Sequence, residues 1–262
     1  MGMNFPGFNG VVLSVVGDVP VDSEAPVVTS SIYPEFAGPV FEDAHRGRVC
    51  VRVFIGVSAR ALCRFLLNQY LIAVPDRSNN EVDPESYNDS QTHFTTSWFV
   101  EESKKGCLDM RCPGFQRTGG SHPFVPGQVI NPVSSTSRRK QYITVRVSKD
   151  QNSGDWEIYF GFDGKAKIIG YYPRSLFTSL SNKPVNIVFG GFAFWKEHKP
   201  SPPMGSGIAP PKNAASFSNL KFFDAAGNAH PIDHDLAHVS DCYPVTDVRD
   251  GVFSYGGPGN VC

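Results

Sequence analysis

Four of the six cysteines have a spacing that suits disulfide bonds. Cys107 and Cys112 are separated by four residues, enough chain for a turn that brings two Cα atoms within bridging range. Cys242 and Cys262 bracket the C-terminal tail. We expect a disulfide bond between the first pair to close a hairpin and one between the second pair to attach the C-terminal tail. Such bonds would place the protein in an oxidising compartment. Cys50 and Cys63 remain, either as free thiols or as a third bridge.

Three histidines, His230, His234 and His238, recur at four-residue spacing. On a helix they would form one stripe that could hold a metal ion. Carboxylates accompany them at Asp233, Asp235 and Asp241. However, Pro231 interrupts the segment, its composition is typical of a loop, and no second ligand cluster occurs elsewhere. We therefore interpret them as surface histidines and expect neither a metal nor another cofactor.

Ser206 stands between two glycines, Gly205 and Gly207, but the pattern Gly-x-Ser-x-Gly of a serine nucleophile is absent. Glycines tolerate positive φ, so this segment predicts a tight turn.

The composition excludes several classes of function. The formal net charge is −1 and the sequence shows no basic stripe, so nothing favours nucleic acid binding. No apolar run approaches the ~20 residues of a membrane-spanning helix. Residues 1–6 contain no basic residue, so no signal peptide is visible in this chain. With 25 glycines and 21 prolines in 262 residues, we expect many turns in one large or two small β domains.

Alternating apolar residues predict strands along most of the chain. The predicted strands are residues 11–16, 27–33, 48–57, 92–100, 142–149, 155–162, 167–171, 185–194 and 216–223. Residues 142–162 are expected to form a hairpin with a wide aromatic face. Residues 58–74 have a helical period, which predicts one short helix, and residues 173–180 predict a helical turn. The expected fold is an all-β antiparallel sandwich of two sheets.

Short motifs occur in a fixed order between residues 82 and 262. They include Pro84-Glu85-Ser86-Tyr87, Thr92-His93-Phe94, the Cys107–Cys112 clip, Gly154-Asp155-Trp156, Gly170-Tyr171-Tyr172-Pro173, Gly190-Gly191, Pro202-Pro203-Met204-Gly205 and Tyr255-Gly256-Gly257-Pro258. In these motifs the chain resembles the neprosin family, whose best-known members are secreted plant glutamic peptidases. Residues 1–81 match poorly, so we expect them to be a separate segment or part of the same sandwich, with the neprosin-like domain at 82–262.

The resemblance implies a sandwich with endopeptidase activity at acid pH, cleavage next to proline, and a catalytic pair of glutamates. This chain departs from that pattern. Phe192 follows Gly190-Gly191, where the family has its second glutamate, and Arg77 takes the apparent position of the first. Phenylalanine cannot hold a proton or orient water, so we expect an impaired enzyme.

Other acidic residues are alternative sources of activity. Glu81, Glu85, Glu157 and Glu197 lie near the family segments and could replace the missing pair, or could be solvated surface groups. Aromatic residues could also form a platform for sugars or Pro-rich peptides, or could pack in the core: Trp98, Tyr159, Tyr171, Tyr172, Phe194 and Trp195. The expected partners are thus Pro-rich peptide or cell-wall polysaccharide, and the expected location is extracellular or in the secretory pathway.

Overall fold

A computed structural model of the protein describes most of the chain after residue 90 and several strands before it. The described residues are 3–5, 8–18, 48–57, 61–67, 87, 91–100, 105–119, 124–134, 141–177, 186–196, 201, 203–223, 229–231, 237–238 and 243–259. For most strands of the large sheet only the backbone is described.

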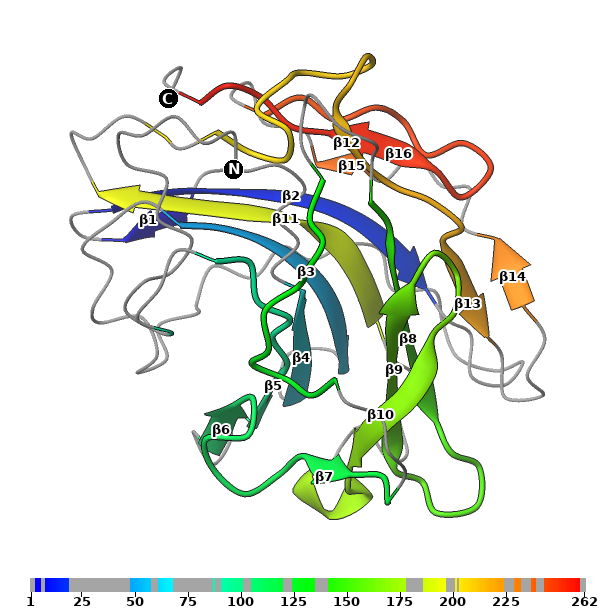
Figure 1. Ribbon diagram of the computed structural model, residues 1–262. Helices are drawn as coiled ribbons and strands as arrows, with labels where there is room; N and C mark the ends of the chain where they lie inside the picture. The colour runs from blue at the N-terminus through cyan, green and yellow to red at the C-terminus, as the bar shows by residue number, and fades with distance from the viewer. Residues whose placement is uncertain are drawn as a thin grey trace.

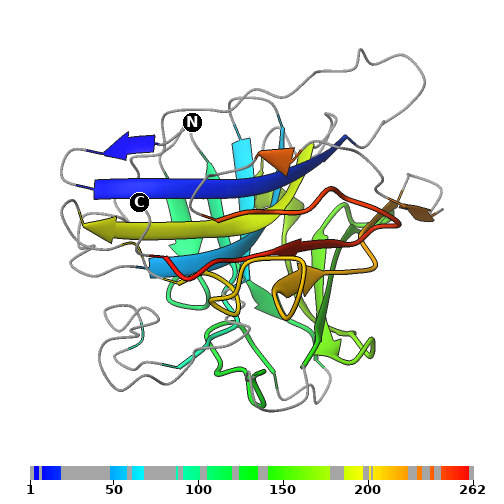
Figure 2. The ribbon, with the colours of Figure 1, turned by 90° about the horizontal axis from the view of Figure 1, so that it is seen from above.

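The large sheet has eight antiparallel strands, in the order β1-β2-β11-β3-β4-β5-β6, with β15 also pairing with β2. Their bounds are β1 Met3–Phe5, β2 Phe8–Asp18, β3 Arg48–Val57, β4 Ala61–Leu67, β5 Ser97–Val100, β6 Lys105–Leu108, β11 Asn186–Lys196 and β15 Ala237–His238. The long strands β2, β11 and β3 lie side by side and curve together in both views (Figures 1 and 2). Strands from the first 67 residues therefore share one sheet with strands from residues 97–108 and 186–196.

The small sheet has the order β7-β10-β9-β8. Its strands are β7 Gln116–Arg117, β8 Ile143–Lys149, β9 Trp156–Phe162 and β10 Lys167–Tyr172, followed by one turn of 3-10 helix at Arg174–Leu176. Strand β10 shifts register between Ile168 and Gly170. A Cβ atom at Gly170 would clash with the Gln116 carbonyl oxygen, so this position needs glycine.

One face of the small sheet forms the core. Alternate residues of β9 are buried, which places Trp156, Ile158 and Phe160 on the same side. The ring centroid of Phe160 lies 4.4 Å from that of Phe94 and 4.1 Å from that of Phe124, on which the Phe160 ring stacks. The buried core cluster is Phe94, Phe115, Ile130, Trp156, Ile158, Phe160, Ile169, Tyr172 and Phe177.

Two short two-stranded sheets complete the described fold. They pair β12 Ala215–Phe217 with β16 Phe253–Tyr255, and β13 Lys221–Phe223 with β14 Ala229–Pro231. Gly205, Ser206 and Gly207 form the predicted tight turn, in which Gly207 N donates to the Met204 carbonyl and both glycines have positive φ.

The sequence predicted the fold class correctly. The described residues form almost only strands, in antiparallel sheets arranged as an open sandwich. The strands predicted at residues 48–57, 142–149 and 155–162 match β3, β8 and β9 closely, and the predicted helical turn is present at Arg174–Leu176. The predicted strand 216–223 is divided between β12 and β13, and the predicted strand 27–33 lies outside the described residues.

The helix predicted over residues 58–74 is wrong at its centre, where β4 runs instead. Strand β4 pairs with β3 at all seven of its positions, and Leu62 also pairs with Phe99 of β5. Ala and Leu favour helix, but that preference amounts to only tenths of a kcal/mol per residue. A helix there would also leave the long edge of β3 unpaired, so sheet pairing overrides the local preference.

Candidate functional site

Phe192 lies in the middle of the large sheet. It pairs with Val12 of β2 on one side and with Cys50 of β3 on the other, and both pairings run without a register shift. The strand that carries Gly190-Gly191 is therefore fixed in position from both edges. Arg77, at the apparent position of the other family glutamate, lies outside the described residues.

The register also tells which face of the sheet Phe192 occupies. Paired residues share a face and the faces alternate along a strand, so Phe192, Arg52, Leu62 and Phe99 lie on one face. Trp98 follows on the opposite face, where it packs against the core cluster. By register, Phe192 therefore shares a face with Phe99 and not with Trp98.

The most extensive cluster of titratable side chains in the described residues surrounds Asp109. This carboxylate is only 3 % exposed. Its Oδ1 accepts a hydrogen bond from the Thr96 backbone N–H at 2.8 Å, and its Oδ2 accepts one from the Tyr87 hydroxyl. The Tyr87 hydroxyl also lies 2.7 Å from Thr95 Oγ1, whose proton it can accept.

Two further groups pack on the Tyr87 ring. His93 stacks on it with ring centroids 3.9 Å apart, and the Arg111 guanidinium lies 5.0 Å from its centroid. His93 Nδ1 donates to the Gly127 carbonyl oxygen at 2.7 Å, which ties the cluster to the turn at residues 126–127. The family motifs around Tyr87, His93 and Asp109 thus meet in one network.

Burial dominates the titration of this cluster. It raises the pKa of the Asp109 carboxyl above its usual range, although the bonds from Tyr87 and Thr96 and the charge of Arg111 act in the opposite direction. Burial and the neighbouring Asp109 carboxylate likewise raise the pKa of Tyr87 well above its ordinary value. Both groups therefore favour their neutral forms more strongly than they do in water.

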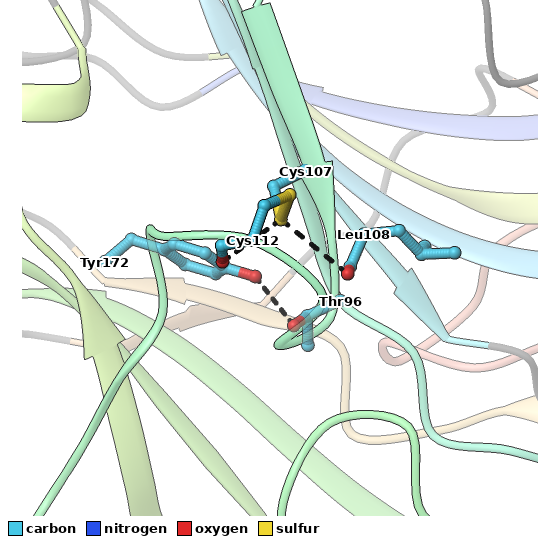
Figure 3. The surroundings of a disulfide bond; sticks show 5 residues. All are labelled: Thr96, Cys107, Leu108, Cys112 and Tyr172. Carbon is cyan, nitrogen blue, oxygen red and sulfur yellow. Dashed lines mark hydrogen bonds between the residues drawn. A yellow bond between two sulfur atoms is a disulfide. The ribbon is translucent and has the colours of Figure 1, made fainter.

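The disulfide between Cys107 and Cys112 holds the Asp109 turn. The two Cα atoms lie 5.9 Å apart, and Asp109 sits between them with a φ of 53°. The Asp109 N–H donates to the Thr96 carbonyl at 2.6 Å, which fixes the turn to the start of β5. Figure 3 shows the clip beside Thr96, whose hydroxyl shares a hydrogen bond of 2.7 Å with the Tyr172 hydroxyl.

This geometry describes a structural carboxylate. Asp109 is buried and each of its oxygens already accepts a protein hydrogen bond, whereas a general base must be within reach of water and substrate. The network joins residues 87–96, the disulfide clip and the turn at Gly127. We interpret it as the anchor that holds these family segments together.

Among the other acidic residues proposed from the sequence, Glu157 is the one that the structure describes; Glu81, Glu85 and Glu197 lie outside the described residues. Its Oε2 accepts a bond of 2.8 Å from the Tyr159 hydroxyl and lies 3.5 Å from Ser148 Oγ. The Arg146 guanidinium covers the Tyr159 ring at 5.3 Å. Glu157 belongs to a polar group on the outer face of the small sheet, opposite the buried Trp156 and Ile158.

The described aromatic residues favour packing over a sugar-binding platform. Tyr172 is fully buried, Trp98 packs against the core cluster, and Arg146 covers the ring of Tyr159. Tyr171 is half-buried beside Gln116, while Phe194 and Trp195 lie in β11.

The histidine and remaining cysteine predictions have mixed outcomes. The helical stripe that a metal site would have needed does not form, because His230 lies in β14 and His238 in β15, which are strands rather than the expected loop. His234, Cys242 and Cys262 lie outside the described residues. A bridge between Cys50 and Cys63 does not fit the register. Cys63 pairs with Ile55, five residues from Cys50, and five residues of strand span roughly 17 Å, more than a disulfide allows.

The family model described as Neprosin matches residues 79–258, about two thirds of the chain. The match includes the Asp109 network, the small sheet and β11. Within the described residues, no helix has the length and apolar character required to cross a membrane.

Proposed function

The chain belongs to the neprosin family, and on that premise we propose that it is a glutamic-peptidase-like protein that no longer hydrolyses peptides with the family's glutamate pair. It binds extended peptide, including Pro-rich peptide, in the former substrate cleft. The observation that carries this proposal is Phe192, which stands after Gly190-Gly191 in a strand whose register is fixed on both sides.

The chemistry of the missing groups supports the proposal. A glutamate pair works because one carboxyl remains protonated beside its partner and the other activates water. Phenylalanine supplies neither function, and loss of one member of a cooperating pair removes most of its effect. In this proposal Asp109 does not replace it, because its carboxyl group is buried away from water and substrate.

Location outside the cell or in the secretory pathway is part of the same proposal. The Cys107–Cys112 disulfide supports it, because such bonds persist in oxidising compartments. Thiol titration of protein taken from its native source tests it. We expect Cys107 and Cys112 to be unreactive before reduction; reactive thiols at both positions would contradict the proposed location.

The proposed loss of hydrolysis is tested with fluorogenic Pro-containing peptides between about pH 3 and 5, around the usual titration of glutamate. We expect initial rates equal to those of a heat-denatured sample. Binding of the same peptides, measured by anisotropy, should persist because the proposed loss concerns only the glutamate pair.

The matched variants are Asp109→Asn and Glu157→Gln. If hydrolysis occurs and one of these variants abolishes it while unfolding normally, the protein is an active acid peptidase that uses a displaced carboxylate, and our proposal is wrong. A variant that leaves the background rate unchanged agrees with the proposal.

A further inference from the structure

The Cys107–Cys112 disulfide joins a paired strand to a segment that follows the end of that strand. Cys107 lies in β6 and pairs with Trp98 of β5, and this pairing ends at Leu108. Cys112 lies beyond that end, in a stretch of turns and bends. The disulfide therefore closes residues 107–112 into one turn, which we call the clip turn, and attaches it to the sheet (Figure 3).

The clip turn supplies two groups to Tyr87. Asp109 accepts the hydrogen bond of the Tyr87 hydroxyl, and the Arg111 guanidinium lies 5.0 Å from the centroid of the Tyr87 ring. Both groups belong to the four residues that the disulfide encloses. The contacts that hold the Tyr87 side chain, and with it the stacked His93 ring, thus depend on the closed form of this turn.

Two properties of Asp109 oppose the closed form. Its φ of 53° is in the left-handed region, which costs free energy for a residue other than glycine. Its carboxyl group is 3 % exposed, so it has given up most of its hydration. Hydrogen bonds with Thr96 and Tyr87 offset these costs. Opening the ring would add many conformations of the turn in which Asp109 returns to water.

The disulfide is accessible from one side. Cys112 is exposed, whereas Cys107 is only 7 % exposed. Thiol–disulfide exchange begins with attack on a single sulfur, so access through Cys112 is sufficient. The closed loop is also very short, and the gain in fold stability from a disulfide decreases with loop length. By thermodynamic linkage the fold protects this bond from reduction by the same modest factor.

We propose that the Cys107–Cys112 disulfide is a redox-controlled switch, opened by small thiols of the glutathione class, and that its reduction releases Tyr87 from the clip turn. The thiolate of the small molecule attacks Cys112 Sγ, the bond to Cys107 breaks, and the Cys107 thiolate takes up a proton. A second thiol attacks the small-molecule sulfur of the mixed disulfide and releases Cys112 as a thiol. The protein gains two electrons and two protons, and two small thiols become one disulfide.

Hydrogen exchange of the full chain in glutathione buffers of decreasing oxidised fraction tests the switch. Alkylation and mass spectrometry of the same samples report whether Cys107 and Cys112 are bonded. We expect reduction to raise the exchange rates of the Thr96 and Asp109 amides by about tenfold or more, because both lose their partners across the clip turn. Amides of β9 should remain protected on this time scale, and oxidised glutathione should restore the original rates.

The matched control is the double variant Cys107→Ser, Cys112→Ser. Its Thr96 and Asp109 amides should exchange at the rates of the reduced wild type and should not respond to glutathione. Any response that remains in this variant belongs to other cysteines. If the variant fails to fold, the reversible change in the wild type still decides.

Three results would overturn the inference. The first is a disulfide that glutathione leaves intact in the folded protein. The second is reduction without faster exchange at Thr96 and Asp109, and the third is loss of protection in β9 at the same time, which indicates global unfolding. None of these results bears on the proposed loss of hydrolysis, which is measured with peptides on the oxidised protein.

Discussion

At the scale of single residues, Asp109 explains why motifs far apart in the sequence occur together. Its carboxylate receives hydrogen bonds from Tyr87 and from the Thr96 backbone, and His93 stacks on Tyr87. These residues lie in the segments on which the family resemblance rests. Their arrangement indicates that much of the resemblance preserves a fold, whereas the proposed loss of activity concerns the position of Phe192.

Asp109 makes stability depend on pH. Because burial raises its folded pKa above the unfolded value near 3.9, the folded state binds the proton more tightly than the unfolded state. Its contribution is therefore fully present below about pH 4 and is lost as the pH rises through the raised pKa. Asp109→Asn should show no such loss, so the melting temperature of this variant should rise relative to that of the wild type as the pH increases from about 4 through the raised pKa. A difference that stays constant with pH in thermal unfolding would contradict this.

Tyr87 should contribute more to the free energy of unfolding than a comparable surface tyrosine does. Tyr87→Phe removes a donor to a buried carboxylate, and we expect a loss of about 1–3 kcal/mol in the free energy of unfolding. Tyr159→Phe removes a bond to the half-exposed Glu157 and should cost below about 0.5 kcal/mol. Urea unfolding measures both. Equal effects would show that the Asp109 network is not the anchor we describe.

The sequence predicted only part of this site. Phe192 could be placed from the two glycines before it, and the disulfide from the spacing of Cys107 and Cys112. Asp109 was missed because its burial depends on Thr96 and Tyr87, residues that only the fold brings next to it. The available signal was an aspartate inside a disulfide-closed turn, a position where positive φ is common and where a carboxylate often accepts hydrogen bonds from backbone N–H groups.

At the scale of elements, strand pairing determined secondary structure that the local sequence pattern did not predict. Strands with strict alternation, such as β3, β8 and β9, were predicted within one or two residues. Strand β4 was predicted as a helix because its sequence is rich in Ala and Leu, and only its seven pairs with β3 show why it is extended.

The disulfide clip should stabilise the element it closes. Replacing Cys107 and Cys112 together by serine should lower the free energy of unfolding by about 2 kcal/mol, the amount expected for a very short closed loop. Reduction of the wild type should produce a similar loss in chemical unfolding. A reductant that shifts the double variant as much as the wild type would show that the effect does not come from this bond.

At the scale of the whole molecule, the large sheet draws on both ends of the chain. Strand β11, which carries Phe192, has β2 and β3 as its two neighbours, and both precede residue 81. We therefore propose that residues 1–81 and 82–262 form one sandwich domain.

A chain that begins at residue 82 tests this proposal. It lacks both neighbours of β11, so the backbone groups of that strand would be unpaired and exposed to aggregation. We expect no cooperative thermal transition by circular dichroism, whereas the full chain should show one. A cooperative transition in the shortened chain would indicate two independent domains.

The central claim is that the protein retains the family fold without the chemistry of its glutamate pair. The most direct measurement incubates the full chain with an equal amount of Pro-rich peptide at about pH 4 and follows the peptide by mass spectrometry. We predict that the peptide remains intact after prolonged incubation. Cleavage products that disappear when a single carboxylate is replaced, as in Glu157→Gln, would contradict the account.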